Sequence, residues 1–118
     1  MTELSELWKE WEVETITKKE NKMDYKIVRT YSMGVFAGYL DPESTETKKI
    51  MRDARRIWYW SGAASLSQLA MEGTSDPANC KFPIAVERVE LTSPNGFEVL
   101  DVTAKAKESI LGVPVWKK

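Results

Sequence analysis

The N-terminal 22 residues combine one short amphipathic pattern with a polar stretch. In residues 3–12 the apolar side chains recur at i, i+3, i+4 and i+7, which places them on one face of a helix. These side chains are Leu4, Leu7, Trp8 and Trp11. Because so short a helix is marginal alone in water, we expect the stripe to be buried against its own domain or against a partner. Residues 13–24 predict a linker or a short edge strand, and we divide the chain into residues 1–22 and a single domain over residues 23–118.

Residues 25–40 have the alternation of β-structure. β-branched and aromatic side chains dominate residues 26–31, and two apolar sets alternate along residues 35–40. Between them, Ser32-Met33-Gly34 predicts a turn, a bulge or a bend in one long strand. The Asp-Pro start of residues 41–45 predicts a turn.

Residues 47–60 allow two interpretations over their first half. Lys48–Met51 can form a strand followed by a short turn, which we prefer, but residues 47–56 can also form a helix. Arg56–Trp60 is so dense in aromatic and β-branched residues that it predicts a strand. On that strand one face would carry Arg56, Trp58 and Trp60, and the other Arg55, Ile57 and Tyr59.

The next segment predicts a helix followed by a strand. Residues 63–72 have helical spacing, with Ser61 as the N-cap and Gly73 just after the end. Residues 83–92 alternate and then fall out of phase, which predicts a strand with a bulge near Glu87-Arg88.

The C-terminal residues predict a hairpin and one more helix. Ser93-Pro94-Asn95-Gly96 is typical of a hairpin turn and leads into a strand over residues 97–102. Residues 104–111 predict a short helix capped by Thr103, and residues 113–116 an extended edge segment. The predicted fold is therefore α+β, a mostly antiparallel sheet with two or three short helices, at residues 3–12, 63–72 and 104–111.

Composition excludes most kinds of chemistry. The 118 residues include no histidine and one cysteine, Cys80, so the usual general base, the usual metal ligand and an internal disulfide are all lacking. No Gly-rich phosphate loop, metal-ligand spacing or paired catalytic carboxylates are recognisable, so we expect no enzyme activity, no metal and no cofactor. The net charge of −1 disfavours extended nucleic acid as a partner, and no segment predicts a membrane span or a signal peptide.

Five tryptophans are many for so short a chain, and they suggest binding. The first candidate is a nucleotide site, because a guanidinium beside an indole can hold a base and its phosphate. Its residues would be Arg55, Arg56, Trp58, Tyr59 and Trp60. The alternative is that one aromatic face belongs to the core and the arginines are surface charges. The second candidate is a self-association interface formed by Leu4, Leu7, Trp8, Trp11 and Trp116.

Four blocks of the sequence resemble a family of small proteins encoded by tailed bacteriophages and prophages. They are VRTYSMGVFAGYL (28–40), ARRIWYWSGAASLSQLAMEG (54–73), CKFP (80–83) and VPVW (113–116), and the second is the most specific. The resemblance covers about residues 25–118 and carries over no activity, ligand or site residue. It implies a viral source and synthesis in the host cytoplasm.

Residues and resemblance together favour a non-enzymatic phage accessory protein that acts by binding. In the infected cell it would engage a host factor or sequester a signalling nucleotide. The alternative is a minor structural or assembly component of the virion.

Overall fold

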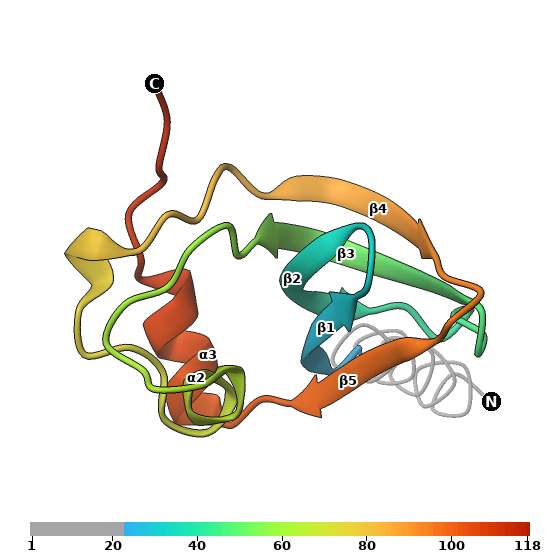
Figure 1. The fold of residues 1–118 in the computed structure, drawn as a ribbon, viewed down its shortest axis with the longest axis horizontal. Helices are drawn as coiled ribbons and strands as arrows, with labels where there is room; N and C mark the ends of the chain where they lie inside the picture. Colours follow the sequence, from blue (N-terminus) through green and yellow to red (C-terminus); the bar gives the residue numbers. More distant parts are fainter. Residues whose placement is uncertain (1–22) are drawn as a thin grey trace, which may run out of the picture.

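A computed structural model of the protein describes residues 23–118, which hold five strands and two α-helices. In chain order they are β1 (Tyr25–Thr30), β2 (Gly34–Leu40), β3 (Lys48–Arg56), α2 (Leu66–Glu72), the 3-10 turn η1 (Pro77–Asn79), β4 (Val86–Thr92), β5 (Phe97–Asp101) and α3 (Ala104–Leu111) (Figure 1). All four strand pairs are antiparallel, in the order β4-β3-β2-β1-β5. The predicted α+β fold is confirmed, while the helix expected over residues 3–12 lies outside the described residues.

The sheet curls until its two edge strands approach each other. β4 and β5 stand at opposite ends of the strand order, yet only four residues connect them, and the N–H of Gly96 bonds to the carbonyl of Ser93 at 3.2 Å. Lys49 Nζ on β3 lies 5.6 Å from the ring centroid of Phe97 on β5, although two strands separate β3 from β5 in the sheet. The turn at residues 93–96 is therefore confirmed, but the predicted hairpin is wrong. β4 pairs with β3 and β5 with β1, because the curl brings β5 round to the free edge of β1.

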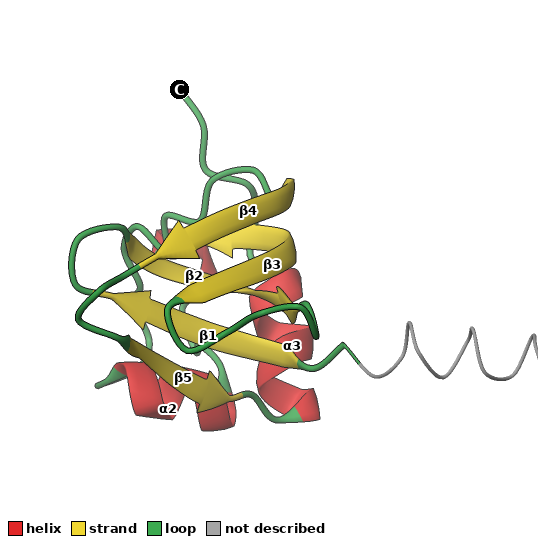
Figure 2. Ribbon diagram, turned by 90° about the vertical axis from the view of Figure 1, so that its right-hand side faces the viewer, coloured by secondary structure: helices red, strands yellow, loops and turns green. Residues whose placement is uncertain are grey.

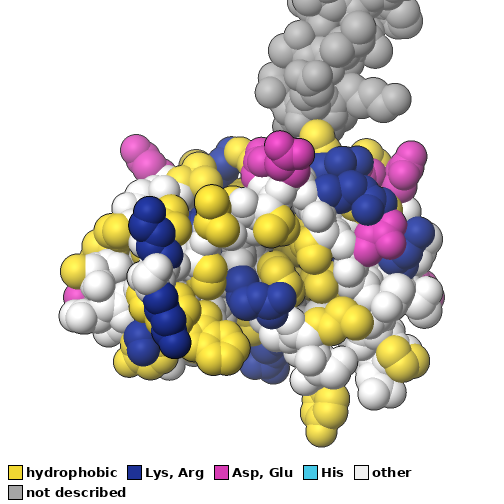
Figure 3. Space-filling view, turned by 90° about the horizontal axis from the view of Figure 1, so that it is seen from above, with side chains coloured by type: hydrophobic (Ala, Val, Ile, Leu, Met, Phe, Trp, Pro, Cys, Tyr) yellow, Lys and Arg dark blue, Asp and Glu magenta, His cyan; other side chains and the backbone are white. Residues whose placement is uncertain are grey.

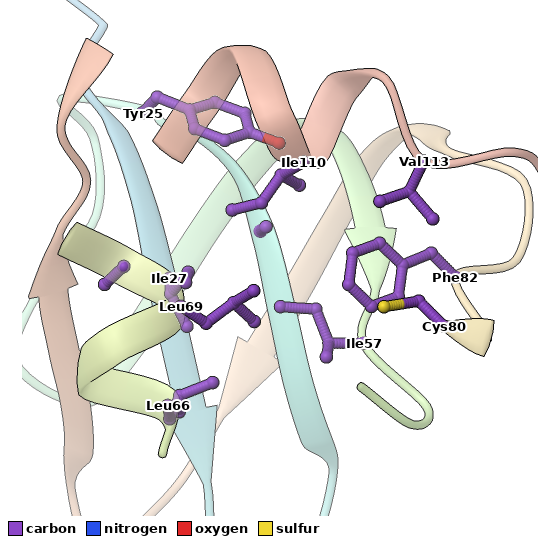
Figure 4. Close-up of a cluster of buried hydrophobic side chains, with 11 residues drawn as sticks. Tyr25, Ile27, Ile57, Leu66, Leu69, Cys80, Phe82, Ile110 and Val113 are labelled. Atoms are coloured by element: carbon purple, nitrogen blue, oxygen red, sulfur yellow. The ribbon is translucent and has the colours of Figure 1, made fainter. Parts of the chain in front are cut away.

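Curling gives the sheet two buried faces. The inner face holds one cluster, made of Val28, Phe36, Met51, Ala54 and Leu91. Both helices lie on the other side of the sheet (Figure 2), where they enclose a larger cluster with β1 and β2. Figure 4 shows that cluster, which includes Ile27, Ile57, Leu69, Phe82 and Ile110. Both apolar sets of residues 35–40 are needed because β2 is covered on both sides.

Two predicted boundaries are resolved by local hydrogen bonds. Residues 31–33 form a turn in which the N–H of Met33 bonds to Thr30 Oγ1 at 2.7 Å, so β1 and β2 are separate strands. Helix α2 begins at Leu66 rather than at residue 63, because Ser65 is the N-cap and accepts the N–H of Gln68 at 3.1 Å. Ser61 is therefore not the cap; its hydroxyl donates to Asp76 at 2.9 Å instead.

Strand β3 is longer than expected and contains the bulge of the sheet. The strand preferred for Lys48–Met51 is confirmed, the turn expected after it is absent, and the helical alternative is wrong. The pairing register with β2 shifts between Ala37 and Tyr39, where Asp53 adopts φ 47°. A Cβ on Gly38 would lie 2.9 Å from the Ala54 Cα, so only glycine allows this close approach. The bulge expected near Glu87-Arg88 is wrong, since β4 keeps one register with β3 throughout.

A buried hydroxyl in the larger cluster gives a first testable prediction. The Tyr25 side chain lies between β1 and α3 (Figure 4), and its hydroxyl has no hydrogen-bond partner among the described residues. Burial raises the pKa of Tyr25 to about 12. Because an unpaired buried hydroxyl is destabilising, Tyr25→Phe should raise the free energy of unfolding by about 1 kcal/mol at pH 7 in a urea titration.

The same substitution should change the alkaline limb of the stability curve. Above pH 10 the unfolded chain ionises this tyrosine while the folded chain keeps it protonated up to about pH 12. The free energy of unfolding of the wild type therefore decreases between about pH 10 and pH 12. In Tyr25→Phe this decrease should be smaller, because the ionising hydroxyl is gone. If Tyr25→Phe is less stable than the wild type at pH 7, the Tyr25 hydroxyl makes a stabilising hydrogen bond and this prediction is wrong.

Candidate binding surface

Arg55 is the most buried of the predicted site residues that lie within residues 23–118. The bulge at Asp53 reverses the alternation of β3, so Ala54 faces the inner cluster and Arg55 faces α3. The guanidinium donates to the carbonyls of Ile110 at 2.9 Å, Val113 at 2.8 Å and Phe82 at 2.9 Å. It also lies 5.4 Å from the Phe82 ring centroid. With 5% of its surface exposed, Arg55 holds the C-terminal segment in place and is not accessible to a ligand.

Arg55 carries its charge in this site without a carboxylate. Burial lowers the pKa of the Arg55 guanidinium, but this group stays protonated at any physiological pH. The carbonyls at the C-terminal end of α3 carry the negative end of the helix dipole and replace a counter-ion. The hydrogen bonds of this one arginine therefore join β3 to the segment around Phe82 and to the end of α3.

Arg56 lies on the exposed side and is separated from Arg55. Its guanidinium stacks on the Phe36 ring at 4.3 Å from the centroid and donates to the carbonyl of Met33 at 2.8 Å. The structure therefore does not bring the two arginines into one site. Arg56 is exposed at the C-terminal end of β3, an inner strand of the sheet.

The aromatic run after β3 leaves the sheet, so the strand predicted over Arg56–Trp60 is wrong beyond its first residue. The N–H groups of Trp58 and Tyr59 both reach the carbonyl of Lys81, at 3.1 and 3.3 Å, and the chain bends away from β2. The predicted alternation of faces fails with it. Trp58 and Tyr59 are both exposed, whereas Trp60 packs on the larger cluster and donates its indole N–H to the carbonyl of Ala63.

Tyr59 and Trp116, which the sequence placed in two different candidate sites, come together around Lys81. The Lys81 ammonium lies 5.8 Å from the Tyr59 ring centroid and 5.6 Å from that of Trp116. Trp58 is 66% exposed and Tyr59 52% exposed. We call the side chains of Tyr59, Lys81 and Trp116 the aromatic–lysine surface.

Three extended segments are laid side by side to build this surface. Tyr59 and Lys81 form an antiparallel bridge, and Phe82 and Val115 form a parallel one. The N–H of Trp116 donates to the carbonyl of Phe82 at 3.0 Å. Phe82 is fully buried, whereas its neighbour Lys81 is exposed. The buried Phe82 side chain and the hydrogen bond from Arg55 to the Phe82 carbonyl therefore hold the segment that lies between Tyr59 and Trp116.

Acidic residues are absent from the chain segments that form the surface. Residues 54–71, 77–86 and 109–118 contain no Asp or Glu, although the whole chain has 18. Within residues 23–118 no carboxylate lies within ion-pair distance of Lys81, Lys117 or Lys118. Figure 3 looks onto the side of the molecule toward which the C-terminus points. On this face Lys and Arg side chains lie among hydrophobic ones, and the acidic side chains lie around the periphery, mainly at the top and on the right of the view.

Beside the surface, the loop around Cys80 is occupied with its own hydrogen bonds. Asp76 accepts from Asn79 and Ser61, which holds the pKa of its carboxyl below the usual range. Cys80 is buried, and its sulfur lies 3.4 Å from the backbone nitrogen of Ser61. No three Cys, Asp or Glu residues in the described part of the chain are grouped to hold a metal ion. None of the helices over residues 23–118 is long and apolar enough to cross a membrane.

Sequence reasoning found the rings of this surface but not its centre. Tyr59 and Trp116 were candidates, whereas Lys81 was not, because a single lysine in a loop carries no motif. The usable signal was the lack of acidic residues in three separate segments. Leu4, Leu7, Trp8 and Trp11 lie outside the described residues, so their self-association role stays a prediction.

Comparison with known proteins gives one match. Residues 23–110 match a family model described as a domain of unknown function, DUF6948, and no curated protein or solved structure matches the chain. The match includes Arg55, Trp58, Tyr59 and Lys81 but ends before Trp116. Since it spans well over half of the 118 residues, the chain belongs to the DUF6948 family of domains.

Proposed function

We propose that this protein works by binding and not by catalysis, and that its ligand carries a nucleobase and phosphate groups. The observation that supports this most is Lys81, whose ammonium is placed against the rings of both Tyr59 and Trp116 and has no carboxylate partner among the described residues. An aromatic ring offers a base a stacking partner, and the adjacent ammonium offers its phosphate an ion pair.

The resemblance to phage proteins supports a setting for this activity. In an infected bacterial cell, a small protein that captures a nucleotide-type ligand would act by sequestering it in the host cytoplasm. No step of this function needs a general base, a nucleophile or a metal, which agrees with a chain that has no histidine. The rigid anchoring of both flanking segments by Arg55 supports the same function, because a preorganised surface loses less entropy on binding.

The test is a thermal-shift and calorimetric titration with nucleoside triphosphates and dinucleotides up to millimolar concentration. We expect an increase in Tm with concentration, since a ligand that binds only the folded state stabilises it. Tyr59→Ala and Lys81→Ala should each weaken binding about tenfold, because each removes one of the paired contacts.

The matched control is Tyr31→Ala. Tyr31 is 91% exposed at the β1–β2 turn, outside the aromatic–lysine surface, so its loss should leave binding unchanged. Binding that is equally sensitive to Tyr31→Ala and Tyr59→Ala, or no response to any ligand of the panel, would contradict the proposed function.

A further inference from the structure

We propose that the aromatic–lysine surface takes single-stranded nucleic acid in preference to a single nucleotide, an inference that rests on the proposed function. The first reason is its openness. A site for a small ligand usually encloses most of that ligand's surface, whereas here Tyr59 is more than half exposed and Ile84, on the segment that carries Lys81, is 73% exposed. An open surface gains affinity by contacting several nucleotides in succession.

The second reason is that the rings come from separate segments with cations between and beyond them. Tyr59, Lys81 and Trp116 lie on three neighbouring extended segments, so ring, ammonium and ring follow one another across the surface. Lys117 and Lys118 continue the chain directly after Trp116. Proteins that bind single strands combine base stacking on aromatic rings with cations that follow the backbone, and this order of side chains provides both.

The third reason is that the net charge of the chain does not describe this surface. The overall value of −1 disfavours nucleic acid, but residues 1–22 alone hold six acidic and four basic side chains. The segments that build the surface hold none of the acidic residues. The carboxylate of Asp76, in the loop that leads to Lys81, accepts hydrogen bonds from Asn79 and Ser61. A polyanion would therefore meet lysines without an opposing carboxylate.

A double helix fits the same surface poorly. In a duplex the faces of the bases are stacked on one another and only their edges are reachable in the grooves. The exposed ring of Tyr59 can stack only on bases that are already unpaired. The ligand class indicated is thus single-stranded DNA or RNA without a sequence requirement.

The experiment is fluorescence anisotropy of the full chain with labelled oligothymidylates of two, four, eight and sixteen nucleotides, with oligouridylate and a duplex alongside. We expect affinity for the eight-nucleotide strand to exceed that for the dinucleotide at least tenfold. Single-strand binding loses affinity with salt at a slope of about −0.7 for each phosphate neutralised, so three lysines predict a slope of about −2. Comparing the thymidylate and uridylate strands shows whether DNA or RNA is preferred.

Three variants, one of them a double substitution, connect the binding to this surface. Tyr59→Ala should lower affinity for the eight-nucleotide strand about tenfold, and Lys117→Ala with Lys118→Ala should reduce the salt slope by more than half. Trp116→Ala should resemble Tyr59→Ala; because Trp116 is half-buried, Tyr59→Ala carries the test if that variant unfolds. Tyr31→Ala is again the matched control and should change neither value.

The possible outcomes separate the two proposals. If mononucleotides bind as tightly as the eight-nucleotide strand, the single-strand inference is overturned and the proposed function stands. If the duplex binds as tightly as the single strand, or Tyr59→Ala has no effect on the oligonucleotide, the inference is also overturned. If no nucleotide and no oligonucleotide binds, both proposals fall.

Discussion

Arg55→Met is expected to lower the free energy of unfolding by about 3–5 kcal/mol, because it removes three hydrogen bonds from a charged donor and each such bond contributes about 1.5–3 kcal/mol before the desolvation of the charge is subtracted. Methionine fills much of the same volume but donates nothing, so the carbonyls of Ile110, Val113 and Phe82 lose their shared donor. The carbonyls of Ile110 and Phe82 keep the backbone N–H groups of Val113 and Trp116 as donors, at 3.2 and 3.0 Å. The carbonyl of Val113 keeps no donor among the described residues, and a buried carbonyl without a partner costs about 1–3 kcal/mol. Chemical denaturation in urea, followed by circular dichroism, measures the change.

Arg56→Met is the matched control because it changes the same residue type one position along the same strand. Arg56 is exposed, stacks on Phe36 and has one hydrogen bond to a backbone carbonyl that water can replace. Its loss should cost no more than about 1 kcal/mol. If the two variants lose equal stability, or Arg56→Met loses more, the hydrogen bonds of Arg55 do not hold the C-terminal segment against β3.

The difference between these two arginines also shows where sequence reasoning ends. Both were candidates for the same ligand because neighbouring positions on a strand differ only in face. The face of Arg55 depends on the bulge at Asp53, which exists because Gly38 on the adjacent strand admits the backbone of Ala54. Nothing in the local pattern of β3 announces that pairing, and the bulge was expected on β4 instead.

Features set by neighbours along the chain were predictable from the sequence. The alternation in residues 25–40, the turn at residues 93–96 and the caps Thr103 and Gly73 all depend on side chains within a few residues, and the structure has them. The pairing of β5 with β1 depends on how far the sheet curls, which is a property of the whole sheet. The hairpin prediction failed for that reason.

The candidate surface likewise combines a feature that the sequence shows with one that depends on long-range contacts. Exposed aromatic rings could be suspected from composition, but their assembly around Lys81 required residues 59, 81 and 116 to meet. The contacts that join them are a single bridge on each side and the Arg55 hydrogen bonds. Long-range contacts of this kind produce no recognisable spacing in the sequence. The lack of acidic residues in all three segments, in contrast, can be read from the sequence.

Gly62→Ala is the second substitution with a large expected effect, about 3 kcal/mol of lost stability. Gly62 has φ +80°, a left-handed conformation that strains an L-residue. A Cβ there would lie 2.4 Å from the backbone nitrogen of Asp76 and 2.8 Å from that of Ser75, so the clash involves backbone that cannot simply rotate away. The N–H of Ser75 donates to the carbonyl of Gly62 at 3.1 Å, and this contact would be pushed apart.

Gly96→Ala separates the strain from the clash. Gly96 has φ +89° in the turn between β4 and β5, and no atom outside its immediate neighbours lies within 4 Å of a Cβ at that position. It should therefore cost only the conformational strain, about 1–2 kcal/mol, in the same urea titration. Equal losses for the two glycines would mean that the loop over residues 74–76 yields to the added methyl group.

Gly62→Ala should also affect oligonucleotide binding, because of where Gly62 lies. The loop that packs on it leads through Cys80, whose sulfur contacts the backbone of Ser61, directly to Lys81. Displacing the loop should therefore shift Lys81 relative to Tyr59 and weaken oligonucleotide binding in whatever fraction remains folded, while Gly96→Ala leaves affinity unchanged. Unchanged affinity in folded Gly62→Ala protein would show that the bridge between Tyr59 and Lys81, together with the Arg55 hydrogen bonds, is enough to hold the surface by itself.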